Sequence, residues 1–188
     1  FAALLLTGSA CHNRYERGLD AIAEQRFEDA RADARIGKQE SPEDPRYDLL
    51  MAQALVKEAE SMSQEMASDT NQPPMALKKV QQRYKKAIPY AQAALDSGQL
   101  NAEAGRLLGK IYWELDNPIE TARVWRIARE ADPESIQNGD YLKALRAALG
   151  RVVFFKDHVK SLELRHELED FVETHPDFMA QLPPEVSQ

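Results

Sequence analysis

The chain has 188 residues, of which 43% are hydrophobic, and it carries 24 Lys and Arg against 31 Asp and Glu, a net charge of -7. This length and apolar content indicate one folded domain with a real core. The acidic balance, without a basic stripe interleaved with aromatics, excludes nucleic acid as an expected partner. Glycine is scarce, with 8 residues, and no long stretch alternates apolar and polar residues, so the sequence predicts an all-α fold.

The N-terminal residues 1–10, FAALLLTGSA, form an apolar stretch that turns to small residues just before Cys11. This arrangement resembles the end of a bacterial lipoprotein signal peptide, whose cysteine is lipidated and becomes the first residue of the mature chain. The resemblance implies a signal or anchor remnant over 1–10, lipidation of Cys11, and a membrane-anchored place in the bacterial cell envelope, facing the periplasm or the cell exterior. Two alternatives stay open: an uncleaved anchor, or a buried N-terminal segment with a free thiol.

Next along the chain, small and apolar residues recur at an interval of 34. Ala87, Ala91 and Ala94 precede Thr121, Trp125 and Ala128 by this interval, and Gly18 precedes Ala52 by the same number of residues. Repeats of this period indicate stacked helical hairpins. The interval predicts three hairpins, over residues 11–44, 45–101 and 102–135.

The middle hairpin is longer than the other two. Between Ala52 and Gly109 the step is 57 residues, which is 34 plus 23. Ser, Asp, Asn and two prolines interrupt the helical pattern in SMSQEMASDTNQPPMALKK, so the sequence predicts an extended loop or lengthened helices near residues 62–78.

The stretch LGKIYWELDNPIETARVWRIAREADP, residues 108–133, resembles the tetratricopeptide repeat family in its residues at fixed positions. The matching positions are Leu108, Gly109, Tyr112, Trp125, Ala128 and Pro133. Thr121 stands where the family prefers alanine. This resemblance implies a short right-handed α-solenoid of about three such hairpins over residues 11–135.

Residues 136–188 are predicted to be C-terminal capping helices and a tail. One helix is expected to place Tyr141, Leu142, Leu145 and Leu149 on one face and to stop at Gly150. A second helix follows in VVFFKDHVKSLELRHELEDFVETHP and is expected to turn the following residues toward the core: Phe155, Val159, Leu162, His166, Leu168, Phe171 and Val172.

The sequence offers no pattern typical of an enzyme. His158 and His166 are eight residues apart, too far along a helix for one metal ion without a further ligand, and HELED lacks the second histidine of a zinc-protease motif. No glycine-rich phosphate loop and no Ser-His-Asp order is present. We therefore expect no metal, no cofactor, no small-molecule substrate and no catalytic residues.

The surface left for function is the concave groove that the first helices of such hairpins line. Carrying the 34-residue register along the chain predicts a partner-binding groove made of Tyr15, Leu19, Ile22, Leu49, Gln53, Lys57, Arg106, Lys110 and Trp113. Trp113 is expected either to be an exposed binding hot spot or to pack against the insertion or the C-terminal helices.

These observations predict a non-enzymatic protein-interaction adaptor or scaffold. Its resemblance to lipoproteins with such repeats implies a membrane-tethered protein that supports assembly of an envelope complex and binds another envelope protein or a peptide segment of it. The alternative is a permanent structural subunit of a large membrane complex, held by an uncleaved N-terminal anchor.

Overall fold

The computed structural model describes residues 5–68 and 74–181, and within these ranges every regular element is a helix. In chain order the helices are α1 (Leu5–Ala23), α2 (Phe27–Glu40), α3 (Pro45–Ser68), α4 (Pro74–Asp96), α5 (Asn101–Glu114), α6 (Pro118–Ala131), α7 (Asn138–Phe154), α8 (His158–Thr174) and a short 3-10 helix, η1 (Pro176–Gln181).

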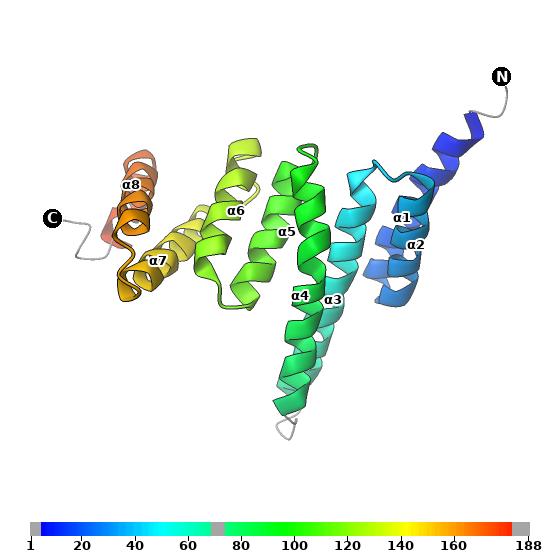
Figure 1. Ribbon diagram of the computed structural model, residues 1–188, viewed down its shortest axis with the longest axis horizontal. Coiled ribbons are helices and arrows are strands. Elements are labelled where there is room, and N and C mark those ends of the chain that lie inside the picture. The colour runs from blue at the N-terminus through cyan, green and yellow to red at the C-terminus, as the bar shows by residue number, and fades with distance from the viewer. Residues whose placement is uncertain (1–4, 69–73, 182–188) are drawn as a thin grey trace.

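Consecutive helices pack in pairs, and the pairs stand side by side in one row, with the two chain ends at opposite ends of it (Figure 1). The first helices of successive pairs also meet, because α1 packs against α3 and α3 packs against α5. This arrangement confirms the predicted all-α solenoid. Helices α7 and α8 form a fourth pair, which packs on α6 at the end of the row.

The turn inside three of the pairs repeats the same geometry. Gln25, Asp116 and Lys156 have left-handed backbones with φ of 60°, 56° and 58°, and each directly precedes the residue that caps the next helix. The amide of that next residue donates to the carbonyl five residues back: Arg26 to Ala21 at 2.7 Å, Asn117 to Tyr112 at 2.9 Å and Asp157 to Val152 at 3.0 Å. This bond satisfies a carbonyl at the end of the first helix and reverses the chain.

Small residues let the helices of a pair approach closely. A Cβ at Gly109 of α5 would overlap the Trp125 ring of α6, and a Cβ at Gly105 would lie 3.0 Å from Ala128 Cβ. Gly109 thus leaves room for Trp125 and Gly105 leaves room for Ala128, one helical turn apart on the same face of α5.

The middle pair carries its extra length in its helices. Helices α3 and α4 have 24 and 23 residues, whereas α2, α5 and α6 have 14 each. Their distal halves project from the row in Figure 1, beyond the neighbouring pairs. Residues 69–73, which belong to the predicted insertion, lie outside the described residues.

The end of α7 differs from the prediction. The helix continues through Gly150 to Phe154, so Gly150 does not stop it, and a Cβ at that position would meet nothing within 4 Å. The chain reverses only at Lys156, and α8 begins at His158.

The predicted core face of the last helix is only half correct. Leu168, Phe171 and Val172 are buried as expected, but Phe155, Val159 and Leu162 are 67%, 69% and 60% exposed. His166 is exposed as well. Phe155 belongs to the turn before α8, and in the first turns of the helix Ser161 is buried in place of Val159 and Leu162.

The predicted N-terminal signal or anchor falls partly outside the described residues. Residues 1–4 are not described, and α1 begins at Leu5 and runs through Cys11. Within the described ranges, no helix has both the length and the apolarity needed to cross a lipid bilayer.

Candidate partner-binding groove

Two hollows lie along the first helices of the pairs. The first has a volume of about 270 Å³ and lies between α1, α3 and α5; its lining residues are Leu19, Ile22, Gln53, Val56, Lys57, Glu60, Glu103, Arg106, Leu107 and Lys110. The second has a volume of about 320 Å³ and reaches from α5 to α7; its lining residues are Arg106, Lys110, Trp113, Glu114, Trp125, Ser135, Ile136, Gln137, Asp140 and Lys143. Arg106 and Lys110 line both hollows, which therefore form one continuous groove.

Most of the predicted groove residues come together there. Leu19, Ile22, Gln53, Lys57, Arg106 and Lys110 line the first hollow, and Trp113 lines the second. These seven residues come from α1, α3 and α5, which are the helices that the 34-residue register assigned to the concave side.

The remaining two predicted residues lie elsewhere. Leu49 is 2% exposed and belongs to the hydrophobic core, so the structure does not place it on the groove surface. Tyr15 is half-buried, with its ring edge-on to Tyr47 at 6.3 Å and Arg46 stacked over it at 5.4 Å. Both residues are covered because α3 is packed between α1 and α5.

A carboxylate balances the cations at the centre of the groove. Glu60 accepts a hydrogen bond from Lys57 at 2.8 Å and another from Lys110. Burial raises the pKa of Glu60, but the hydrogen bonds and charges of Lys110 and Lys57 outweigh it, so the pKa is lowered overall. Among the described residues Arg106 makes no ion pair, which leaves its charge for a bound group.

The two tryptophans form one unit in the wider part of the groove. Their rings stack with centroids 6.4 Å apart and planes 17° from parallel, and Lys143 of α7 lies 5.2 Å from the Trp113 ring. Trp125 Nε1 also donates to the Arg106 carbonyl at 3.2 Å. Trp113 thus lines the groove and at the same time contacts the fourth pair, which combines the two alternatives that the sequence left open.

Two buried side-chain oxygens in the described part of the chain have no hydrogen-bond partner, Gln53 Oε1 and Ser135 Oγ. Gln53 lines the first hollow and Ser135 lines the second. Because buried polar atoms in folded proteins are nearly always paired, these two oxygens are exceptions among the residues that line the groove.

Residues of α7 were missed by the sequence reading. Asp140 and Lys143 line the second hollow, and Ala147 lines a neighbouring one. A further step of 34 residues from Arg106 and Trp113 reaches Asp140 and Ala147, so the same register could have found them. The sequence instead predicts capping helices over residues 136–188, so the predicted groove stops at Trp113.

Within the described ranges no group of three or more His, Cys, Asp or Glu side chains is placed to hold a metal ion. His166 and His158 are exposed on α8, and His175 stacks on Phe171 with centroids 4.4 Å apart.

Comparison with known proteins gives no family. No family model and no curated protein matches the chain. A solved structure of a mutant of the protein MamA matches 87% of this chain and 98% of its own chain, with 15% identical residues and a TM-score of 0.32.

Proposed function

We propose that the protein is a non-enzymatic interaction scaffold that binds a segment of another protein in the groove along α1, α3, α5 and α7. The observation that carries this proposal is the continuity of the two hollows through Arg106 and Lys110. A continuous trough over several helices fits an extended or helical peptide better than a small molecule, which binds in an enclosed cavity.

The chemistry of the groove suits a peptide with both apolar and polar side chains. The first hollow offers Leu19, Ile22 and Leu107 as apolar contacts, beside the balanced charges around Glu60. The wider hollow offers the Trp113 ring, and tryptophan is the residue type most enriched among binding hot spots.

Site-specific photo-crosslinking tests this proposal. A photoreactive phenylalanine analogue is placed at Gln53 in the groove. As the control, it is placed at Tyr90, an exposed aromatic residue on α4, the second helix of the middle pair. Irradiation in an extract of the source cells should give a discrete adduct from position 53 and none of that mass from position 90.

A substitution in the groove provides the second arm of the test. Trp113→Ala should reduce the yield of the adduct roughly tenfold, because it removes the largest apolar side chain of the wider hollow. Tyr90→Ala should leave the yield unchanged. Adducts of equal yield from both positions, or an adduct insensitive to Trp113→Ala, would contradict a binding role for the groove.

Tethering to a membrane of the bacterial envelope is a further part of the proposal, supported by the sequence before Cys11 that resembles a lipoprotein signal. Cleavage before Cys11 would remove the first residues of α1, from Leu5 to Ala10. Lipidation would confine the scaffold near an envelope partner and raise its effective concentration there.

Mass spectrometry of the mature N-terminus tests the tether. A peptide that starts at Cys11 and carries a diacylglyceryl group is the expected result. A mature chain that keeps residues 1–10 would contradict lipidation and favour the alternative, a structural subunit of a membrane complex held by an uncleaved segment.

A further inference from the structure

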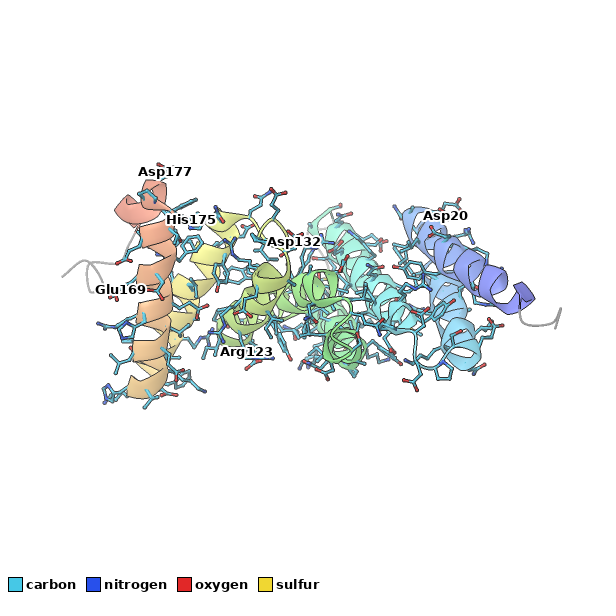
Figure 2. All side chains as sticks on the ribbon, turned by 90° about the horizontal axis from the view of Figure 1, so that it is seen from above. Asp20, Arg123, Asp132, Glu169, His175 and Asp177 are labelled. Carbon is cyan, nitrogen blue, oxygen red and sulfur yellow. The ribbon has the colours of Figure 1, made fainter. Side chains whose placement is uncertain are left out.

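In the described part of the chain, the one element after α8 is the short η1, which packs on α8, and no further helix pair follows in the row. A hollow between α6 and α8 is lined on the α8 side by Lys160, Glu163 and Glu167, which defines the inner side of α8. Arg126 of α6 binds Glu167 at 3.3 Å. Residues three or four apart share a helix face, so Leu162 and Arg165 lie on the other side of α8. Figure 2 shows α8 at the end of the row, with Glu169, four residues after Arg165, on the side away from α6.

A hollow of about 450 Å³ opens on this outer side between α7 and α8. Its lining residues are Lys143, Arg146, Ala147, Leu149, Gly150, Val153 and Arg165. Every ionic residue among them is a cation, and the other lining residues are apolar or glycine. We call this hollow, together with the neighbouring Leu162, the end surface.

Large exposed apolar side chains are concentrated at the turn between α7 and α8, where Val153 lines the hollow. Among the described residues, nine large hydrophobic side chains are exposed, and five of them fall within residues 153–162: Val153, Phe154, Phe155, Val159 and Leu162. In a solenoid each pair covers the apolar side of the one before it, so an apolar end is where a further helix would stack. Contiguous exposed apolar surface on a soluble domain usually marks an interaction site.

The charge of this region is opposite to that of the whole chain. Residues 143–165 contain six Lys and Arg (143, 146, 151, 156, 160 and 165) against two acidic residues (157 and 163), whereas the whole chain has 24 against 31. Lys143 and Arg146 make no ion pair with any described residue. An acidic ligand would therefore gain charge complementarity here without breaking an existing pair at either residue.

We propose that the end surface binds an acidic amphipathic helix of a partner protein, which stacks on α7 and α8 as the next helix of the row would. Its apolar face covers Val153 and Leu162, and carboxylates on its flanks pair with Lys143 and Arg146. This second interaction surface does not depend on the groove along the first helices, since of its residues only Lys143 lines both.

The test measures the fluorescence anisotropy of two labelled peptides with the full chain. The acidic probe is a helix of about 18 residues with leucine at every third or fourth position and glutamate on both flanks. The basic probe has the same leucines and lysine in place of glutamate. The acidic probe should bind roughly tenfold more tightly than the basic one, and its affinity should fall as salt is raised.

Variants of the chain locate the site. Arg146→Glu and Leu162→Ser should each weaken the acidic probe roughly tenfold. The matched controls are Lys85→Glu and Leu77→Ser on α4, which change an exposed cation and an exposed leucine away from the four hollows described above and should leave binding unchanged. Circular dichroism checks that each variant is folded, and Arg146→Gln serves as a milder replacement.

Several results would overturn the proposal. They are equal binding of the two probes, no binding of either, or equal losses in the variants and the α4 controls. Binding of the chain to anionic phospholipid vesicles that is lost in Leu162→Ser, without binding of the acidic probe, would assign the end surface to a membrane. Concentration-dependent association lost in the same variant would assign it to a second copy of the chain.

Discussion

Replacement of Gly37 by alanine tests the close packing that joins the first two helix pairs. Gly37 lies in α2, and a Cβ at this position would overlap the Cδ1, Cε1 and Cζ atoms of the Tyr47 ring at the start of α3. Tyr47 is 0% exposed, and Tyr15 packs edge-on against it at 6.3 Å. The ring is enclosed, so it cannot move aside without shifting its neighbours.

Two effects of opposite sign set the size of the change. Alanine improves helix propensity by at most about 1 kcal/mol relative to glycine. Overpacking of an enclosed site costs about 1 to 3 kcal/mol, and the ring overlap places Gly37→Ala at the upper end of that range. We expect a net loss of about 1 to 2 kcal/mol, which for a chain of this size lowers Tm by roughly 2 to 8 °C.

Thermal and guanidinium unfolding, followed by circular dichroism, measure this loss. Gly150→Ala is the matched control, because Gly150 lies inside α7 and its Cβ would meet nothing within 4 Å. That variant should gain about 0.5 to 1 kcal/mol from helix propensity alone. If Gly37→Ala proved as stable as the wild type, or gained as much as Gly150→Ala, the packing of Tyr47 on α2 would not be as described.

Two more predictions concern aromatic residues of the C-terminal half. Trp125→Ala should lower the free energy of unfolding by about 2 to 4 kcal/mol, because Trp125 fills the space over α5, and Trp113→Ala should lower it by about 1 to 2 kcal/mol, because mainly ring contacts are lost. In guanidinium unfolding, the double variant should show a coupling energy of about 0.5 to 1.5 kcal/mol between the two rings. A coupling energy near zero would mean that the rings do not stack. Burial raises the pKa of the Tyr141 hydroxyl, and the negative charge of Glu167 raises it further. The contribution of Tyr141 to the free energy of unfolding is therefore complete below about pH 10, the pKa of tyrosine in the unfolded chain, and is lost as the pH rises above that value. Tyr141→Phe should remove this part of the alkaline pH dependence, measured by urea unfolding between about pH 9 and 11, and an unchanged dependence would contradict the assignment.

The repeat interval in the sequence predicts the arrangement of the helices well, for a physical reason. A hairpin unit must place small residues where its helices approach and large ones around them, so the spacing of Ala94 and Ala128 reports the structural period directly. Both alanines are 0% exposed. The third hairpin was the most reliable part of the prediction because its small and aromatic positions are both occupied.

The boundary between α7 and α8 is harder to predict, because an uncommon residue type reverses the chain there. The run VVFF continues the apolar pattern of α7, and the left-handed residue that reverses the chain is Lys156 rather than glycine or asparagine. Asp157, whose side chain accepts a hydrogen bond from the Lys160 amide at 3.2 Å, was the better signal, since aspartate is a preferred N-cap. Gly150 is a weak signal for the end of a helix, because a single glycine inside a helix costs only about 1 kcal/mol.

The register predicts which residues are equivalent but not how exposed they are. Leu49 and Arg106 occupy the same position in successive units, yet Leu49 is buried and Arg106 is exposed. The difference follows from the neighbours: α3 is packed on both sides by α1 and α5, whereas α5 has no comparable contact with α7. The row of first helices therefore opens toward its C-terminal end, and this spacing is a property of the whole stack that no single unit encodes.

The opening between α5 and α7 connects the two proposed surfaces. Lys143 lines the hollow that holds Trp113 and also the hollow of the end surface, so its ammonium group lies at the boundary of both. One ammonium group can satisfy one carboxylate fully, and like charges brought to it from two ligands repel each other. Two ligands that each pair with Lys143 should therefore weaken each other. The groove and the end surface are thus two binding surfaces that share one cation, and occupation of one should lower the affinity of the other for an acidic ligand.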